Sequence, residues 1–72
     1  MKKNILLQFG NKVRQERIKR NLSQEELAEK VGVHRTYMGM IERAEKNITL
    51  LNIEKIANAL DLPLSKLFLN IK

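Results

Sequence analysis

Cysteine and tryptophan are absent from this 72-residue chain, and histidine and proline each occur once. Without cysteine the chain has no disulfide, no thiolate metal site and no cysteine nucleophile. The one histidine, His34, cannot by itself build the ligand set of a typical zinc site. The aromatic residues are few, Phe9, Tyr37 and Phe68, so we expect an aliphatic core. Neither a metal nor another cofactor is expected.

Long apolar runs are also missing. None approaches the ~18 residues that indicate a membrane-spanning helix, and no signal peptide is visible, so we expect a cytoplasmic protein. The length allows one small domain, residues 1–72, with few residues left to enclose an active-site pocket. No glycine run of the kind that cradles a phosphate is present. We therefore expect that the protein is not an enzyme.

The charge is strongly positive. Lysine and arginine number 14 against 8 acidic residues, a net charge of +6, and residues 1–20 hold most of the excess. A small basic domain commonly binds a polyanion, usually nucleic acid. Two other readings exist, a solvated helix face and attachment of the first helix to a membrane surface. The second is disfavoured, because the narrow apolar face of that helix is needed for the core.

Helix breakers are scarce, which predicts an all-α domain of five short helices. We expect these helices at about 4–20, 23–31, 34–43, 50–60 and from Pro63 to 68. Asn21 tolerates the left-handed conformation that ends a helix. Ser23 and Glu26 have the spacing of a capping box at the start of the second helix. Thr49 is a suitable N-cap for the fourth.

The segment from Gln24 to Arg43 has the pattern of a helix-turn-helix. Its fifth residue, Ala28, is small enough for two helices to cross closely. Its ninth, Gly32, supplies the positive φ that a tight turn requires. Five further positions are apolar, as the pattern demands: Leu27, Val31, Val33, Met38 and Ile41. An ordinary helical hairpin is the alternative, but it does not require all seven positions to agree.

Over nearly its whole length the chain resembles the Cro and phage-repressor type of helix-turn-helix proteins, the xenobiotic-response-element family. The matching stretches are Phe9–Arg14, Leu22–Ala28, Gly32–Val33, Tyr37–Met38, Ile41–Arg43 and Leu51–Leu60. Arg35-Thr36-Tyr37, together with Asn47-Ile48-Thr49, resembles more narrowly the small dimeric controller proteins of restriction–modification operons. The family commonly has glycine where Asn21 and Ala44 stand. Either Ala44 is therefore strained, or the third helix ends differently here.

The helix over 34–43 would enter the major groove of DNA and present its outward face to base edges. The candidate base contacts are Arg35, Thr36, Tyr37 and Met40. Arg35 is the strongest, because a guanidinium can bind guanine O6 and N7 together. Thr36 and Met40 can each contact a thymine methyl. Tyr37 either contacts DNA or is a half-buried structural residue.

Gly39 lies in the middle of the same helix, where glycine is unfavourable. Either DNA approaches this face closely, or another helix does. The candidate phosphate contacts lie around it: Gln24, His34, Arg43, Lys46 and Asn47. Such contacts position a protein on DNA without reading its sequence. Gln24 is placed on a phosphate by the family resemblance, at the positive end of the second helix.

Arg17 and Glu42 fall on otherwise inward faces of the first and third helices, and the resemblance implies that they form an ion pair. One recognition helix reads too few base pairs for genomic specificity, so we also expect a homodimer on a pseudo-palindromic double-stranded operator. The apolar C-terminal residues share the core and the dimer surface: Leu50, Leu62, Leu64, Leu67, Leu69 and Ile71.

The sequence thus predicts a cytoplasmic, DNA-binding transcription regulator that controls a restriction–modification operon from its own promoter. RNA polymerase is a further candidate partner. The alternatives are an antitoxin-type DNA-binding protein that also binds a toxin protein, and a generic phage-type repressor.

Overall fold

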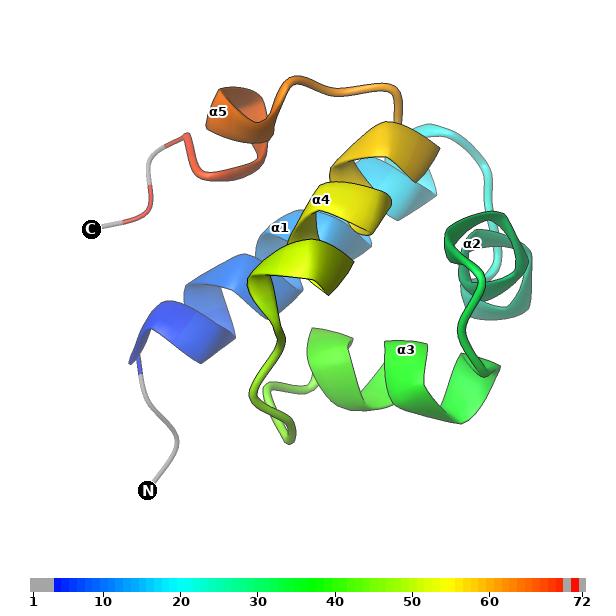
Figure 1. The fold of residues 1–72 in the computed structure, drawn as a ribbon, viewed down its shortest axis with the longest axis horizontal. Helices are drawn as coiled ribbons and strands as arrows, with labels where there is room; N and C mark the ends of the chain where they lie inside the picture. The colour runs from blue at the N-terminus through cyan, green and yellow to red at the C-terminus, as the bar shows by residue number, and fades with distance from the viewer. Residues whose placement is uncertain (1–3, 70, 72) are drawn as a thin grey trace.

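The computed structural model describes residues 4–69 and residue 71, and these form five helices joined by short turns (Figure 1). The helices are α1 (Asn4–Lys19), α2 (Gln24–Val31), α3 (Arg35–Glu42), α4 (Leu50–Ala59) and α5 (Leu64–Leu67). Within the described residues there is no strand, and the all-α, five-helix class is confirmed. Helices α1, α3, α4 and α5 each end one residue earlier than the sequence predicted.

The helix starts follow local side-chain chemistry. Ser23 Oγ accepts a hydrogen bond from the Glu26 N–H at 3.0 Å, and the Glu26 carboxylate accepts from the Ser23 N–H at 2.8 Å, which completes the predicted capping box. Thr49 caps α4 through the Asn52 N–H at 3.1 Å. At α5, Pro63 occupies the N-cap and forms no side-chain cap. The first three or four N–H groups of a helix lack partners inside it, so each cap fixes where a helix begins.

Four helices end in the same way, with one left-handed residue just beyond the helix. These residues are Asn21, Gly32, Ala44 and Asp61, with φ of 57°, 88°, 61° and 56°. In each turn the following N–H bonds back to a carbonyl in the last helical turn, at 2.8–3.1 Å. This is the Schellman arrangement, which satisfies carbonyls that the helix leaves open. Asp61 was not expected in this role.

Ala44 resolves the alternative that the sequence left open. The residue keeps the left-handed conformation that glycine usually supplies, and its side chain is buried. The Glu45 N–H bonds to the Met40 carbonyl at 2.8 Å, so α3 ends in the same kind of turn as the helices before Asn21, Gly32 and Asp61. Left-handed backbone costs an alanine about 1–2 kcal/mol. The domain therefore carries mild strain directly after α3.

The core is aliphatic, as predicted, and gathers residues from all five helices. Its members are Phe9, Val13, Leu27, Ala28, Val31, Met38, Ile41, Ile56, Ala57, Leu60 and Leu67. α2 packs on α3 and α4, while α1 packs on α3 and α5. α3 lies along one edge of the molecule and α5 lies toward the opposite side (Figure 1). The core thus holds α3 at the surface with its outer face uncovered.

Gly10 marks the closest approach between α1 and α3. A Cβ atom at this position would lie 2.6 Å from the Ile41 carbonyl oxygen and 2.7 Å from that of Glu42. Both atoms belong to backbone, which cannot move aside as a side chain can. The absence of a side chain at Gly10 therefore sets the distance at which α1 supports the end of α3.

Candidate nucleic-acid interface

A shallow groove of about 580 Å³ lies between the start of α2 and the outer face of α3. The residues that line it come from α2, α3 and their flanking positions, with one from α1: Arg17, Ser23, Gln24, Glu25, Arg35, Thr36, Gly39 and Arg43. The N-terminus of α2 opens into it, and a helix N-terminus favours anions. The groove thus combines a positive helix end with guanidinium groups.

Arg35 and Thr36 are exposed at the start of α3, where their side chains are free to meet a partner. The Arg35 guanidinium lies 3.8 Å from the Glu25 carboxylate, and both side chains are about two-thirds exposed, at 67% and 71%. An exposed ion pair of this length contributes little to stability. Arg35 can therefore exchange Glu25 for another acceptor at low cost.

Tyr37 and Met40 lie outside the groove and are half-buried. The Tyr37 hydroxyl oxygen accepts a hydrogen bond from Asn52 Nδ2 of α4 at 3.1 Å. Its ring packs against the hydrophobic core. Tyr37 thus has a structural role, and its hydroxyl proton remains available as a donor.

Gln24 and His34 each serve the fold at a helix start. The Gln24 side-chain amide donates to the Glu42 carboxylate at 3.1 Å. His34 is the N-cap of α3, and its Nδ1 accepts from the Thr36 N–H at 3.1 Å. With Nδ1 as the acceptor, the neutral ring carries its proton on Nε2. That N–H is a donor on an exposed side chain, beside Arg35 in a second hollow of about 340 Å³.

Arg43, Lys46 and Asn47 are all exposed. Arg43 is the residue that follows α3, and its Nε lies 3.1 Å from the Glu45 carboxylate. Lys46 and Asn47 belong to the loop that leads to Thr49 and α4. Of the five predicted phosphate contacts, Gln24 and Arg43 line the groove and the other three lie beyond it.

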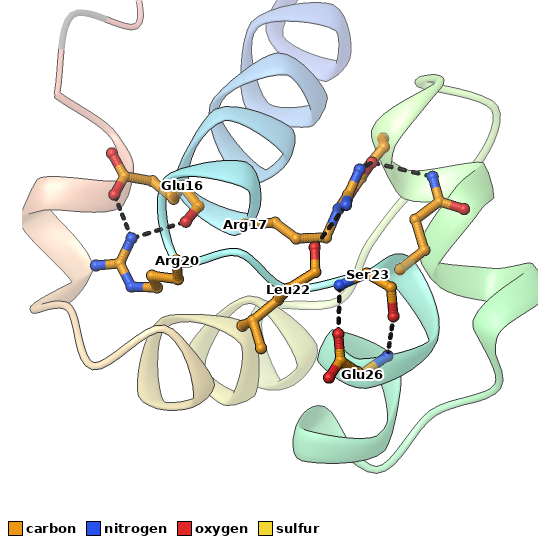
Figure 2. Close-up of polar contacts among 8 residues, drawn as sticks. Glu16, Arg17, Arg20, Leu22, Ser23 and Glu26 are labelled. Atoms are coloured by element: carbon orange, nitrogen blue, oxygen red, sulfur yellow. Dashed lines mark hydrogen bonds and ion pairs between the residues drawn. The ribbon is translucent and has the colours of Figure 1, made fainter.

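Arg17 of α1, which lines the groove, forms an ion pair with the buried Glu42 of α3. Arg17 Nε donates a hydrogen bond to Glu42 Oε2 at 2.7 Å, and Arg17 Nη2 donates one to Glu42 Oε1 at 3.1 Å, so the contact is bidentate. Arg17 Nη1 also donates to the Leu22 carbonyl at 2.8 Å (Figure 2). With the Gln24 amide, this network joins α1, α2 and α3. Each of its donors has an acceptor, which buried polar groups require.

A second buried carboxylate was not predicted. Glu16 of α1 is 6% exposed and meets three cations: Lys12 of the same helix at 3.5 Å, Lys19 at 3.4 Å, and Arg20, the residue just after the helix, at 2.7 Å. Figure 2 shows Arg20 reaching both the carboxylate and the backbone carbonyl of Glu16. The signal in the sequence is one acid among bases three or four residues away.

Most of the basic side chains in residues 1–20 are therefore paired with carboxylates of the same domain. Three of its cations face Glu16, and Arg17 faces Glu42. The guanidinium groups that line the groove, apart from Arg17, come from α3 and its end. The expectation of a polyanion partner thus rests on Arg35 and Arg43 rather than on the basic first segment.

Two carboxyl groups titrate below their ordinary range. The hydrogen bond from Arg20 lowers the pKa of Glu16, aided by Lys19 and opposed by burial. The backbone and side chain of Ser23 lower the pKa of Glu26 through the capping box. Both groups are thus held in their charged form by the folded structure.

The apolar C-terminal residues divide between core and surface. Leu67 lies in the core, and Leu62 and Ile71 are half-buried against it. Leu50, Leu51, Leu64 and Leu69 remain exposed. Leu50, Leu51, Glu54 and Leu64 line an apolar hollow of about 350 Å³ between α4 and α5. This surface, called here the leucine patch, is separate from the groove.

Residues 4–69 and 71 contain no group of three or more histidine, cysteine, aspartate or glutamate side chains that could hold a metal ion. Within the same part of the chain, no helix is both long and apolar enough to span a membrane.

The chain is similar in sequence and in structure to known helix-turn-helix proteins. A family model described as helix-turn-helix matches residues 13–67. The control protein C.BamHI of Bacillus amyloliquefaciens is 56% identical over 61 residues, which cover 83% of this chain and 75% of that protein. The restriction–modification controller protein C.AhdI from Aeromonas hydrophila has a similar structure, with a TM-score of 0.86, 44% identity and coverage of 88% and 96%. SinR, a master regulator for biofilm formation solved in complex with DNA, gives a TM-score of 0.78, 34% identity and coverage of 83% and 97%.

Proposed function

The chain belongs to the Cro and phage-repressor type of helix-turn-helix transcription regulators, and on that premise we propose that it is the homodimeric controller of a restriction–modification operon. Regulators of this type bind double-stranded DNA. We propose that this one acts in the cytoplasm and binds the promoter of its own operon. The relatives named control proteins support that choice over an antitoxin or a phage repressor.

The observation that carries the proposal is the groove. It exposes Arg35 and Thr36 at the start of α3 beside the N-terminus of α2, and Arg43 follows at the other end. In a helix-turn-helix, the first residues of the second helix contact base edges while the first helix crosses the phosphate backbone. Arg35 and Thr36 would read bases, and Gln24 and Arg43 would bind phosphates.

The remaining predicted contacts fit around this core. Tyr37 and Met40 would meet DNA with the parts of their side chains that stay exposed. His34 Nε2–H, Lys46 and Asn47 would bind phosphates on either side of the groove. Contact with RNA polymerase belongs to the proposal as well, without an assigned residue, and in vitro transcription from the operon promoter tests it.

The direct test is binding to DNA from immediately upstream of the gene, against a scrambled fragment, in a salt series. We expect a preference of roughly a thousandfold or more at physiological salt. The footprint should show two related half-sites about 34–36 Å apart. Arg35→Ala should reduce that preference, because it removes a guanine contact. Equal and weak binding to both fragments, with a steep loss in salt, would indicate phosphate attraction alone and refute the proposal.

The leucine patch is the proposed dimer surface. Leu50 and Leu51 are 73% and 59% exposed, more than any other large apolar residue among those described. Leu50→Gln with Leu51→Gln should shift the protein toward monomer in sedimentation velocity and weaken operator binding. Ile5→Gln with Leu7→Gln is the matched control, because these leucine and isoleucine side chains are also exposed but belong to α1 and do not line the patch. A control pair that dissociates the dimer equally would place the interface elsewhere.

A further inference from the structure

Gly39 stands in the middle of α3, where glycine weakens a helix relative to alanine. The backbone gives no reason for it. Among the described glycines only Gly32 has a positive φ, so Gly39 has a conformation that any residue can adopt. The residue is nevertheless buried. Something other than backbone geometry therefore occupies the space that a side chain would take.

The occupants are the ends of two side chains. A Cβ atom at Gly39 would lie 2.9 Å from Nη1 of Arg43, 3.4 Å from Oε1 of Gln24 and 3.6 Å from Cζ of Arg43. All three neighbours are side-chain atoms, unlike the carbonyl oxygens that face Gly10. Close contact with another helix, one of the two explanations suggested by the sequence, is therefore not what requires a glycine here. The Arg43 guanidinium lies directly over the bare backbone.

We propose that Gly39 is a positioning residue for DNA binding. Because it has no side chain, the Arg43 guanidinium can lie against the backbone of α3, and we call this space the seat of Arg43. The inference rests on the proposed function, since it concerns how that same groove meets a DNA phosphate. Arg35 or Thr36, Gly39 and Arg43 follow one another at intervals of about four residues, and all line the groove. They therefore share one face of the helix. The seat keeps Arg43 on that face and beside Gln24.

Replacing Gly39 by alanine should change stability and DNA binding in opposite directions. Its methyl group would displace the flexible end of Arg43, which the fold tolerates, and alanine is the better helix former. Gly39→Ala should therefore unfold at a higher temperature than the wild type. At the same time the methyl group should displace the Arg43 guanidinium from its place along α3, so the groove should bind DNA less tightly. A purely structural glycine would move both properties in the same direction.

The experiment compares wild type, Gly39→Ala, Arg43→Ala and the double variant by fluorescence anisotropy. The probe is the upstream DNA fragment, titrated over a salt series. We expect Gly39→Ala to bind the upstream and the scrambled fragment more weakly by a similar factor, and to lose roughly one unit of salt slope, as for one lost phosphate contact. In the Arg43→Ala background the same change should have no further effect. Asn58→Ala is the control for added helix stability, since Asn58 is exposed near the end of α4.

The outcomes are distinct. Wild-type affinity in Gly39→Ala would overturn the inference while leaving the proposed function in place. A loss that persists in the Arg43→Ala background would also overturn it, because the methyl group would then be meeting DNA or Gln24 directly. Wild-type protein that fails to prefer upstream DNA over a scrambled fragment would refute the proposed function itself.

Discussion

Replacing Glu42 by alanine is the sharpest perturbation of the network beneath the groove. The Glu42 side chain is only 2% exposed, and its carboxylate accepts two hydrogen bonds from Arg17 and one from Gln24. Glu42→Ala removes all three acceptor contacts at once. The Arg17 guanidinium, 12% exposed, would keep only its bond to the Leu22 carbonyl.

The magnitude follows from the charge left behind. Removing one partner of a buried ion pair typically costs about 3–5 kcal/mol, because the other charge remains desolvated. Small domains have total stabilities near the lower end of roughly 5–15 kcal/mol. A domain of this size loses roughly 4–8 °C of melting temperature for each kcal/mol. The melting temperature of Glu42→Ala should therefore fall by at least about 12 °C, with much of the protein's stability gone.

Thermal unfolding and urea unfolding, both followed by helical circular dichroism at pH 7, measure the effect. Glu25→Ala is the matched control, since it removes a glutamate from the same groove whose ion pair is long and exposed. The control should leave the midpoint nearly unchanged. A double variant, Arg17→Met with Glu42→Leu, should recover part of the loss, because apolar residues of similar volume leave no buried charge unpaired.

An unchanged midpoint and slope for Glu42→Ala would refute the reasoning. So would a double variant that is less stable than the sum of its single changes predicts, because the two residues would then not act as a pair. If folding is instead intact and only the operator preference changes, Glu42 reads DNA and its burial has been misjudged.

Three further predictions concern separate parts of the domain. Glu16→Gln should weaken the acid dependence of stability, because Arg20 lowers the pKa of Glu16 in the folded state. The stability that the charged Glu16 contributes is present above about pH 4.5 and is lost as the pH falls through the folded-state pKa. Thermal melts between pH 7 and pH 3 will show the difference. Gly10→Ala should destabilise the domain by about 1–3 kcal/mol in urea, since the methyl group would meet backbone oxygen at 2.6 Å; a gain in stability would mean that α1 can move outward freely. Tyr37→Phe should cost about 0.5–1.5 kcal/mol through the lost hydrogen bond from Asn52, and an equal stability in both proteins would show that the bond has no net value.

The parts of the fold that local chemistry determines could be predicted from the sequence. The capping box at Ser23 and the turn at Gly32 depend on residues close in the chain, and each residue type admits few alternatives. The same holds for the left-handed Asn21. The helix-turn-helix could be located because its constraints are all local. The sequence allows two alternatives at Ala44, since only the complete turn after α3 shows that a non-glycine residue keeps the left-handed conformation.

What could not be predicted depends on contacts between helices. The need for glycine at position 10 becomes visible only when α3 is placed against α1. Leu67 and Leu50 look alike in the sequence, yet one lies in the core and the other is 73% exposed. The ion pairs of Glu16 do not show in the net charge of a segment, because such a count treats every basic side chain as available to a partner. Local patterns fix where helices begin and end, but not which side chains meet across them.

The groove therefore has two kinds of cation with opposite physical settings. Arg17 is buried and already paired on both prongs, so it joins α1 to α3 and cannot release its carboxylate without a large loss of stability. Arg35 and Arg43 are exposed, with glutamates at 3.8 Å and 3.1 Å that compete weakly in water. A phosphate or a guanine edge can displace those glutamates at little cost, whereas nothing displaces Glu42. The buried pair thus gives the groove its shape, and the exposed pairs hold the Arg35 and Arg43 guanidinium groups until a stronger acceptor replaces the glutamates. Sensitivity to salt should accordingly reside in the exposed pairs, and sensitivity to mutation in the buried one.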